Sequence, residues 1–330
     1  MAHATLKAAS GGGIRGEALV QPIRIGIVGV GKIARDAHVP SISANPAFVL
    51  AATASPHGEL PGVVSFASLE SMLDGVPELA AVALCTPPQV RYEAARLALE
   101  RGKHVLLEKP PCPSVAGLEH LSALAQTTGR TLYQTWHSQE APAVARAARE
   151  LSGRTLKRVR VTWQEDVREW HPGQRWLWEA GGFGVFDAGI NALSILTRII
   201  PEPLLARSAR LHVPENCATP IAAELTLATA SGVPIEARFD FRHPGTPRWE
   251  IEISTNRGPL TLADGGATLR LAGARAATPQ VFLGGEYAAI YRRFCELIAR
   301  GESEVDARPL RCVADLYLLA THVTVEAFAG

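Results

Sequence analysis

Short apolar runs alternate with helical patterns through the first 135 residues of the chain. In the helical pattern at 89–101, Ala94, Leu97 and Ala98 fall on one face. Strands that alternate with helices are typical of βαβ units, which build a parallel sheet. We therefore expect an N-terminal α/β domain with strands at 23–29, 48–53, 79–84, 104–107 and 131–135 and helices at 32–38, 89–101 and 115–126.

The pattern changes after about residue 155, where apolar and polar residues alternate with period two. Phe239 and Phe241 share one face of a strand, and Arg238 and Asp240 take the other. Two strands at 221–228 and 235–241 are predicted to form a hairpin around residues 231–232, and the meander is predicted to continue through 249–253 and 260–262. This half of the chain is thus expected to be an α+β domain whose open sheet is largely antiparallel.

Both ends of the chain carry their own patterns. Two apolar stripes at helical spacing predict helices over residues 287–298 and 316–327. Residues 1–20 are rich in small residues and hold no apolar signal-peptide core. We expect this segment to be a disordered tail.

Composition and charge exclude several classes of protein. The 330 residues are 47% hydrophobic, and 33 basic side chains against 32 acidic ones leave a net charge of +1. That balance gives no electrostatic basis for binding nucleic acid or an anionic membrane, and no apolar run approaches the ~18 residues of a membrane span. The five cysteines are scattered without a CxxC pair, so we expect neither a metal site nor a disulfide framework, and a cytoplasmic location.

A glycine-rich loop follows the first predicted strand. Gly29 and Gly31, with Lys32, Ile33 and Ala34, fit the pattern G-x-G-x-x-[GA]. The first glycine makes the turn, the second admits a pyrophosphate, and the small third residue lets helix and strand pack closely. A plain tight turn is the alternative, but the strand before the loop and the helix after it favour dinucleotide binding.

The end of the second strand bears on the choice of dinucleotide. The acidic residue that usually clamps the ribose is missing there, since the segment Ala54-Ser55-Pro56-His57 holds no carboxylate and the next acid is Glu59. Ser55 can donate to a 2′-phosphate, although no arginine is adjacent in sequence. We therefore predict that both NAD and NADP are accepted, with Ser55 and His57 beside the ribose.

Two further positions suggest catalytic chemistry. Lys109 follows the fourth strand, at the sheet edge where ligands bind, and an ammonium there would polarise a substrate oxygen; a solvated loop lysine is the alternative. Asp187 and Asn191 are four residues apart and so lie on one helix face. A helix cap is the alternative for Asp187, whereas an amide in an apolar helix needs partners.

Four of the six tryptophans lie between residues 163 and 178, among carboxylates and amides. Aromatic faces with polar neighbours commonly hold sugar rings. A loop packed over the sheet is the alternative for Trp176 and Trp178. His137, after the fifth strand, is a further candidate for the substrate site, with a structural histidine as its alternative.

Taken together, these motifs resemble the Gfo/Idh/MocA oxidoreductases. The resemblance implies a Rossmann NAD(P)-binding domain at 21–137, a substrate and oligomerisation domain at 138–307, and a C-terminal helix at 308–330 that packs back on the first domain. Asn191 departs from the family, which more often has histidine there. The matching motifs are the glycine loop, Thr86-Pro87, Glu108-Lys109-Pro110, and Asp187 with Asn191.

Residues 165–174 and 184–195 look like the subgroup of bacterial L-arabinose/D-galactose 1-dehydrogenases. This resemblance implies oxidation of the anomeric C1 hydroxyl of an aldopyranose to the aldonolactone, with hydride transfer to NAD(P)+, in a homodimer. It implies Lys109, Asp187 and Asn191 as catalytic residues. Thr86, Pro87, Glu108 and Lys109 join the cofactor site, and Glu165, Trp170, His171, Asn191 and Trp249 join His137 at the substrate. The alternatives are another sugar or inositol dehydrogenase, an aldose–aldose oxidoreductase, an NAD-dependent glycosidase, and a non-catalytic sugar sensor.

Overall fold

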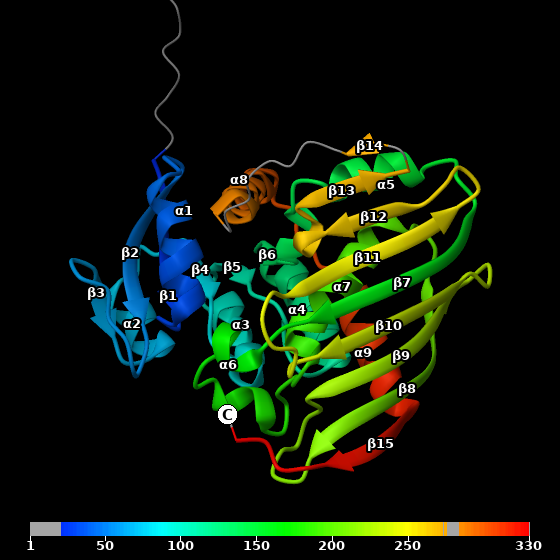
Figure 1. The fold of residues 1–330 in the computed structure, drawn as a ribbon. Coiled ribbons are helices and arrows are strands. Elements are labelled where there is room, and N and C mark those ends of the chain that lie inside the picture. Colours follow the sequence, from blue (N-terminus) through cyan, green and yellow to red (C-terminus); the bar gives the residue numbers. More distant parts are fainter. Residues whose placement is uncertain (1–20, 273, 276–283, 330) are drawn as a thin grey trace, which may run out of the picture.

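The chain folds around two sheets, which Figure 1 shows side by side. The computed structural model describes residues 21–272, 274–275 and 284–329. The tail predicted at residues 1–20 lies outside the described residues.

The first sheet is parallel and has the strand order β3-β2-β1-β4-β5-β6. It matches the predicted N-terminal α/β domain, except that β3 and the following helix α2 (Leu69–Gly75) were not predicted. A strand of three residues is too short to show a period in the sequence. The strands are β1 (Ile23–Val28), β2 (Phe48–Ala54), β3 (Val64–Phe66), β4 (Ala81–Leu84), β5 (His104–Leu107) and β6 (Leu132–Gln134).

The helices of this unit follow the prediction closely. Those that come after β4 and β5 are α3 (Pro88–Glu100) and α4 (Val115–Thr128). The helix after the glycine loop contains a π-helical turn, η1 (Ala34–His38), and continues as α1 (Val39–Ser43). A π turn is rare and often marks a functional site. Here it contains His38, which is completely buried.

The second sheet has the order β14-β13-β12-β11-β7-β10-β9-β8-β15 within the described residues. It is largely antiparallel as predicted, and only the pairs β7–β10 and β8–β15 are parallel. The predicted continuous meander from β10 to β11 is wrong, because β7 lies between them. The strands are β7 (Leu156–Gln164), β8 (Leu204–Pro214), β9 (Ala222–Thr229), β10 (Pro234–Asp240), β11 (Arg248–Thr255), β12 (Leu260–Ala263), β13 (Thr268–Leu271), β14 (Ala274–Arg275) and β15 (Ala320–Val325).

One face of the second sheet is covered and the other is open. Helices α5 (Val144–Leu151) and α7 (Phe186–Ile199) lie on the covered face, together with α9 (Arg308–Leu318). Short helical segments complete the connections: η2 (His137–Glu140), α6 (Val167–Trp170), η3 (Arg175–Trp178) and η4 (Asp264–Gly266). No helix in the described ranges is long and apolar enough to cross a membrane.

The C-terminal segment differs from the prediction. The helix that packs against the first sheet is α8 (Gly284–Arg300), whose buried stripe includes Tyr287, Tyr291 and Phe294. Helix α9 instead packs chiefly on α7 and β8, and the chain beyond Leu319 forms β15. The predicted helix at 316–327 is therefore wrong in its second half, because the run Thr321–Val325 is rich in β-branched residues, which favour a strand.

Candidate active site

The candidate site lies at the carboxyl edge of the first sheet. Strands β1, β4 and β5 are neighbours there, so the glycine loop, Thr86 and Lys109 follow adjacent strands. The chain order reverses between β1 and β4, and open α/β sheets bind ligands at such a point.

The two glycines of the loop play different parts. Gly29 has φ +89°, and a Cβ on it would lie 2.8 Å from the backbone nitrogen of Thr86, so only glycine fits this turn. A Cβ on Gly31 would meet nothing within 4 Å, and this open space is where a pyrophosphate would lie. The loop therefore fits a dinucleotide. Lys32 forms an exposed ion pair with Asp36.

The loop after β2 borders the glycine turn, because the Gly29 N–H donates to the carbonyl of Ala54 at 2.8 Å. Ser55 and His57 both lie in this loop, where the backbone N–H of His57 is 3.4 Å from the Ser55 hydroxyl. The structure also brings in a cation that sequence adjacency did not reveal. The guanidinium of Arg35, from η1, donates to the carbonyl of Glu59 at 2.9 Å.

Lys109 and Asp187 meet across the two units of the fold. Lys109 Nζ lies 3.1 Å from Asp187 Oδ2 and donates to the Asp187 carbonyl oxygen at 2.9 Å. Asp187 is in the first turn of α7, yet within the described residues its carboxylate caps no backbone N–H. The cap interpretation is thus wrong, and the carboxylate faces the lysine.

Several buried acceptors in the elements that border this pair have no partner within the described residues. They are Asn191 Oδ1, one turn beyond Asp187, Thr86 Oγ1 and Gln89 Oε1. A buried polar atom without a partner is costly, so these atoms fit hydroxyl or amide donors from a ligand. Sequence analysis missed Gln89, whose Nε2 donates to the Trp176 carbonyl at 2.8 Å and so links α3 to η3.

A second group of predicted residues lies next to Asp187. His171 Nε2 is 3.1 Å from Glu165 Oε1, and His171 Nδ1 is 4.0 Å from Asp187 Oδ2. The indole N–H of Trp249 donates to Glu165 Oε2 at 2.7 Å. Trp170 packs edge-on against Trp249 and is itself 40% exposed. The structure therefore brings together Glu165, Trp170, His171 and Trp249, four of the residues that were predicted at the sugar.

The remaining tryptophans of the run belong to the core. Trp178 packs against Phe241 and Phe328, and Trp176 packs against the buried apolar cluster. The packed-loop interpretation applies to both.

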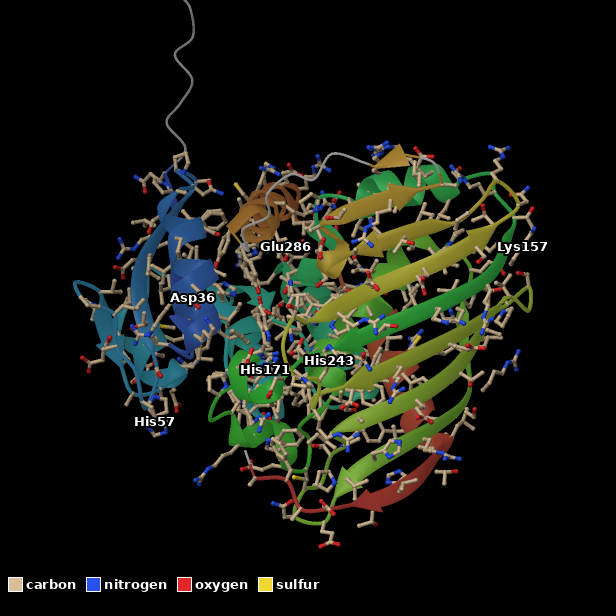
Figure 2. All side chains as sticks on the ribbon, viewed as in Figure 1. Asp36, His57, Lys157, His171, His243 and Glu286 are labelled. Atoms are coloured by element: carbon tan, nitrogen blue, oxygen red, sulfur yellow. The ribbon has the colours of Figure 1, made fainter. Side chains whose placement is uncertain are left out.

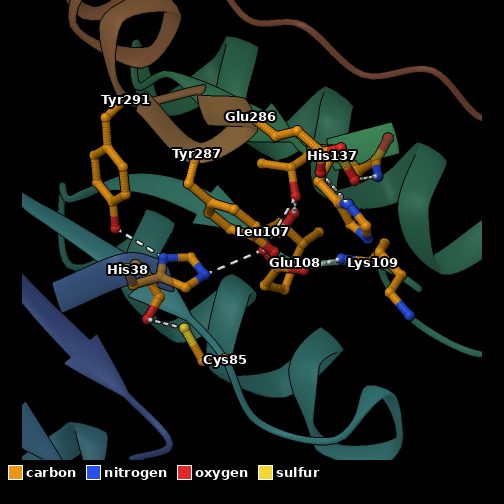
Figure 3. Close-up of polar contacts among 12 residues, drawn as sticks. His38, Cys85, Leu107, Glu108, Lys109, His137, Glu286, Tyr287 and Tyr291 are labelled. Atoms are coloured by element: carbon orange, nitrogen blue, oxygen red, sulfur yellow. Dashed lines mark hydrogen bonds and ion pairs between the residues drawn. The ribbon is translucent and has the colours of Figure 1, made fainter. Parts of the chain in front are cut away.

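Glu108 has a different environment from the one its predicted cofactor role suggests. Its carboxylate is buried, and Figure 3 shows it at the centre of a polar network. Oε1 accepts from Tyr287 at 2.8 Å and lies 3.1 Å from His38 Nε2, while Oε2 accepts the backbone N–H of Lys109 at 2.9 Å. The carboxylate thus holds the backbone of Lys109 in place, and a cofactor contact by Glu108 stays a prediction.

Charges around Glu108 decide its protonation. Burial alone raises the pKa of Glu108, but the hydrogen bond and charge of His38, with the charges of His137 and Arg91, outweigh it and bring the pKa to about 2. Burial has the opposite effect on His38 and lowers its pKa. Cys85, Tyr291 and Glu108 around the ring outweigh burial and raise the pKa of His38 well above its ordinary value. The pair is therefore an imidazolium and a carboxylate.

His137 is held by a residue that sequence analysis did not single out. Its Nδ1 lies 2.8 Å from Glu286 Oε2, at the start of α8, and Figure 3 shows the ring on the same side of the network as Lys109. No side chain within the described residues bonds Nε2 of His137. Groups of three or more metal-ligating side chains are also absent from the described part of the chain.

Comparison with known proteins extends this description. The model of the Gfo/Idh/MocA oxidoreductase family, with an NAD-binding Rossmann fold, matches residues 23–136. The galactose 1-dehydrogenase of Pseudomonas fluorescens is 46% identical over 313 residues, which make up 94% of this chain and 99% of that protein. The crystal structure of D-galactose-1-dehydrogenase from Rhizobium etli superposes with a TM-score of 0.88 at 49% identity, covering 95% of this chain and all of that one. The 3-ketoreductase KijD10 from Actinomadura kijaniata, solved with NADP, shares the fold with a TM-score of 0.80 at 20% identity over 92% of this chain and 99% of its own.

Proposed function

The chain belongs to the Gfo/Idh/MocA oxidoreductase family, and on that basis we propose that it is an NAD(P)-dependent aldose 1-dehydrogenase. It oxidises the C1 hydroxyl of an aldopyranose of the galactose or arabinose type to the lactone. The similarity to galactose 1-dehydrogenases over nearly the whole chain supports this substrate class. A non-catalytic sugar sensor is not favoured, because such a protein would not need the paired lysine and aspartate.

The observation that carries the proposal is the contact between Lys109 and Asp187. A cation and a carboxylate from separate units of the fold lie 3.1 Å apart at the carboxyl edge of a dinucleotide-type sheet. Both are largely shielded from water, with side-chain exposures of 14% and 4%. Charges in such an environment act strongly on a bound substrate.

These residues account for the chemistry of an alcohol oxidation. The nicotinamide, when bound, supplies the acceptor for the hydride that leaves C1. Lys109 holds the C1 oxygen and stabilises the negative charge that develops on it. Asp187 takes the proton of that hydroxyl, directly or through Lys109. Asn191 orients the oxygen, since its amide donates and accepts without changing charge.

The paired indole rings of Trp170 and Trp249 form the subsite for the sugar. Trp170 and Trp249 offer apolar ring faces, and polar groups of Glu165 and His171 lie beside them.

L-Arabinose and D-galactose share their ring stereochemistry from C1 to C4 and differ by a hydroxymethyl group. A difference of that size changes binding by only about 1–3 kcal/mol, so we expect both to react.

The test is a panel of aldoses assayed with both cofactors through the absorbance of the reduced nicotinamide at 340 nm. We expect D-galactose and L-arabinose to be oxidised fastest, with the lactone as product, and inositol not to react. Failure of every aldose would refute the proposed function.

Two features bear on where and how the protein works. All five cysteines, which lie in the described ranges, are free thiols, and this supports a reducing compartment such as the cytoplasm.

We also propose that two copies associate through the open face of the second sheet. Across β7 and β10 that face places arginine beside glutamate, as in the pair Arg158–Glu236, which suits self-association about a twofold axis.

A further inference from the structure

Oxidation of an alcohol releases one proton per turnover, and that proton must leave the site. On the proposed function, Asp187 receives it. The Asp187 side chain is only 4% exposed, and Lys109 beside it is 14% exposed. A group that links this buried pair to solvent is therefore needed for each cycle.

His171 has the position for that task. Its Nδ1 approaches the same Asp187 oxygen, Oδ2, as the Lys109 ammonium does, and at 18% its side chain is more exposed than those of Lys109, Asp187 and Glu165. Figure 2 labels it between the parallel sheet and the large second sheet. Its ring packs against Phe241, which keeps it facing Asp187.

Glu165 fixes the tautomer of this histidine. Glu165 Oε1 lies 3.1 Å from His171 Nε2, and a carboxylate accepts only, so Nε2 carries the hydrogen. In the neutral ring Nδ1 then has a free lone pair, and Nδ1 is the atom 4.0 Å from Asp187 Oδ2. The indole of Trp249 holds the other oxygen of Glu165 at 2.7 Å, which keeps the carboxylate in place.

We propose that His171, oriented by Glu165, is the proton outlet of the catalytic pair. Bound NAD(P)+ would supply the acceptor for the hydride that leaves C1 with the electron pair of the broken C1–H bond, and the O1–H proton passes to Asp187. The proton then moves from Asp187 to Nδ1 of His171 and from there to water, so Asp187 is ionised again for the next turnover.

Charged groups from several segments surround the ring of His171. Glu165 and Asp187 face the ring from two sides, and Lys109 faces Asp187 from β5. On its own segment, the buried carboxylate of Asp166 pairs with the exposed guanidinium of Arg168. The separation of 4.0 Å exceeds a hydrogen bond, so transfer needs one bridging oxygen or a ring movement of about 1 Å.

The first experiment separates a proton relay from a sugar contact. In His171→Gln the side chain stays polar but cannot carry a proton, and we expect kcat to fall about tenfold or more while KM for the sugar changes little. The pH dependence of kcat should differ between the parent protein and the variant, because only the parent protein carries a side chain at position 171 that can accept the proton. The matched control is His243→Gln, a neighbouring histidine that should leave kcat unchanged.

Chemical rescue tests the same step in a variant that leaves space. Added imidazole should raise the kcat of His171→Ala with increasing concentration and leave the parent protein unaffected. A His171→Gln variant with the parent pH profile, or one altered in KM alone, would overturn the proposal. Melting temperatures of all variants show whether the fold is kept.

A second readout does not depend on activity. The 15N chemical shifts of the His171 ring in the isolated protein report its tautomer, and we expect the hydrogen on Nε2 in the neutral form. Glu165→Gln should relax this preference. A neutral ring with its hydrogen on Nδ1 would contradict the proposal even if the aldoses are oxidised, whereas failure of the aldose panel would refute the proposed function and leave this result intact.

Discussion

At the scale of single residues, the choice of lysine at position 109 has a physical reason. Its ammonium donates both to the carbonyl and to the carboxylate of Asp187. An ammonium is a compact charge with three donors, which leaves one donor for a substrate oxygen, and it can give up its proton. A guanidinium is planar and always charged, so arginine would not replace it.

Replacing Lys109 should therefore remove turnover. We expect Lys109→Met to lower kcat by about 10²–10⁴-fold, the range for loss of a positioned acid or base. Lys109→Arg should fare no better. Lys157→Met, at the far end of the second sheet, is the control and should turn over normally. Near-normal kcat in Lys109→Met would exclude the assigned role.

The site residues differ in how far the sequence reveals them. Lys109 and Asp187 were predictable, because each stands at the start of a recognisable motif beside a strand or helix end. Gln89 and Glu286 were not, since their partners Trp176 and His137 lie 87 and 149 residues away in the chain. Only the tertiary fold creates such contacts, and no local pattern encodes them.

The position of Arg35 leads to a prediction on cofactor choice. Residues 55–57 after β2 hold no carboxylate to repel a 2′-phosphate, and Arg35 adds a cation that donates to the backbone carbonyl of Glu59. We expect kcat/KM for NAD and NADP to differ by less than about a hundredfold. Arg35→Ala should weaken NADP by roughly tenfold and NAD much less, as a lost charge-assisted hydrogen bond implies. Titration of each cofactor by fluorescence checks this, and equal weakening of both would contradict it.

At the scale of elements, the network around Glu108 ties three segments together. His38 comes from η1, Glu108 follows β5, and Tyr287 and Tyr291 come from α8. Figure 3 shows the four side chains converging while Lys109 points away from them. The network thus fixes the backbone of Lys109 and docks α8 onto the first sheet with the same carboxylate.

The shifted pKa values predict how this network responds to pH. Glu108 has a pKa of about 2 against an ordinary 4.5, so its contribution to stability is present above 4.5 and is lost as the pH falls toward 2. For His38 the raised pKa means a contribution that is full below 6.5 and is lost as the pH rises through the raised value. Stabilisation by the pair is therefore greatest between about pH 4.5 and 6.5.

Glu108→Gln tests this window. At pH 6 the variant should lose about 3–5 kcal/mol of unfolding free energy, because a buried imidazolium is left without its anion. The deficit should shrink at pH 3, where the parent protein has begun to lose the same interaction. Denaturant titrations at both values measure it, with the exposed Glu119→Gln as control. A deficit that is equal at pH 3 and pH 6 would argue against the assigned pKa values.

Whole elements followed the sequence where their period was unambiguous. Five of the six strands of the parallel sheet and α8 were predicted, because buried strands are short apolar runs and α8 carries a continuous aromatic stripe. Strand β7 was not predicted, although Val159, Val161 and Trp163 alternate along it. The polar residues that follow Trp163 obscure the end of this period-two pattern. Its place between β10 and β11 depends on pairing that only the fold decides.

At the scale of the whole molecule, the chain crosses between its two units more than once. Helix α8 returns to the first sheet, and β15 closes the edge of the second beside β8. The candidate site is thus held by contacts from both units, through Tyr287 of α8 and the hydrogen bond from Gln89 to η3. The relative position of Lys109 and Asp187 follows from these crossings.

The open face of the second sheet is charged in a regular way. Arg160 of β7 lies beside Glu252 of β11 and Glu236 of β10 in the strand register, and Arg238 lies beside Glu224. Rows of alternating sign are self-complementary when a second copy is turned by a half rotation. Such a contact depends on charge and should weaken as salt rises.

We predict a dimer through this face that is lost when one row is inverted. Arg160→Glu places three carboxylates side by side in each copy and repels the partner, so sedimentation equilibrium should show a shift toward monomer, largest at low salt. Arg300→Glu makes the same charge change at the end of α8, away from the sheet, and should remain dimeric. Exchanging the pair, with Arg160→Glu and Glu252→Arg together, restores the balance within each copy and should recover part of the association. A parent protein that is monomeric at micromolar concentration would refute the predicted dimer. A dimer that Arg160→Glu leaves unchanged would place the contact on another surface, because this substitution reverses the sign of the charge interaction on which the proposed interface depends.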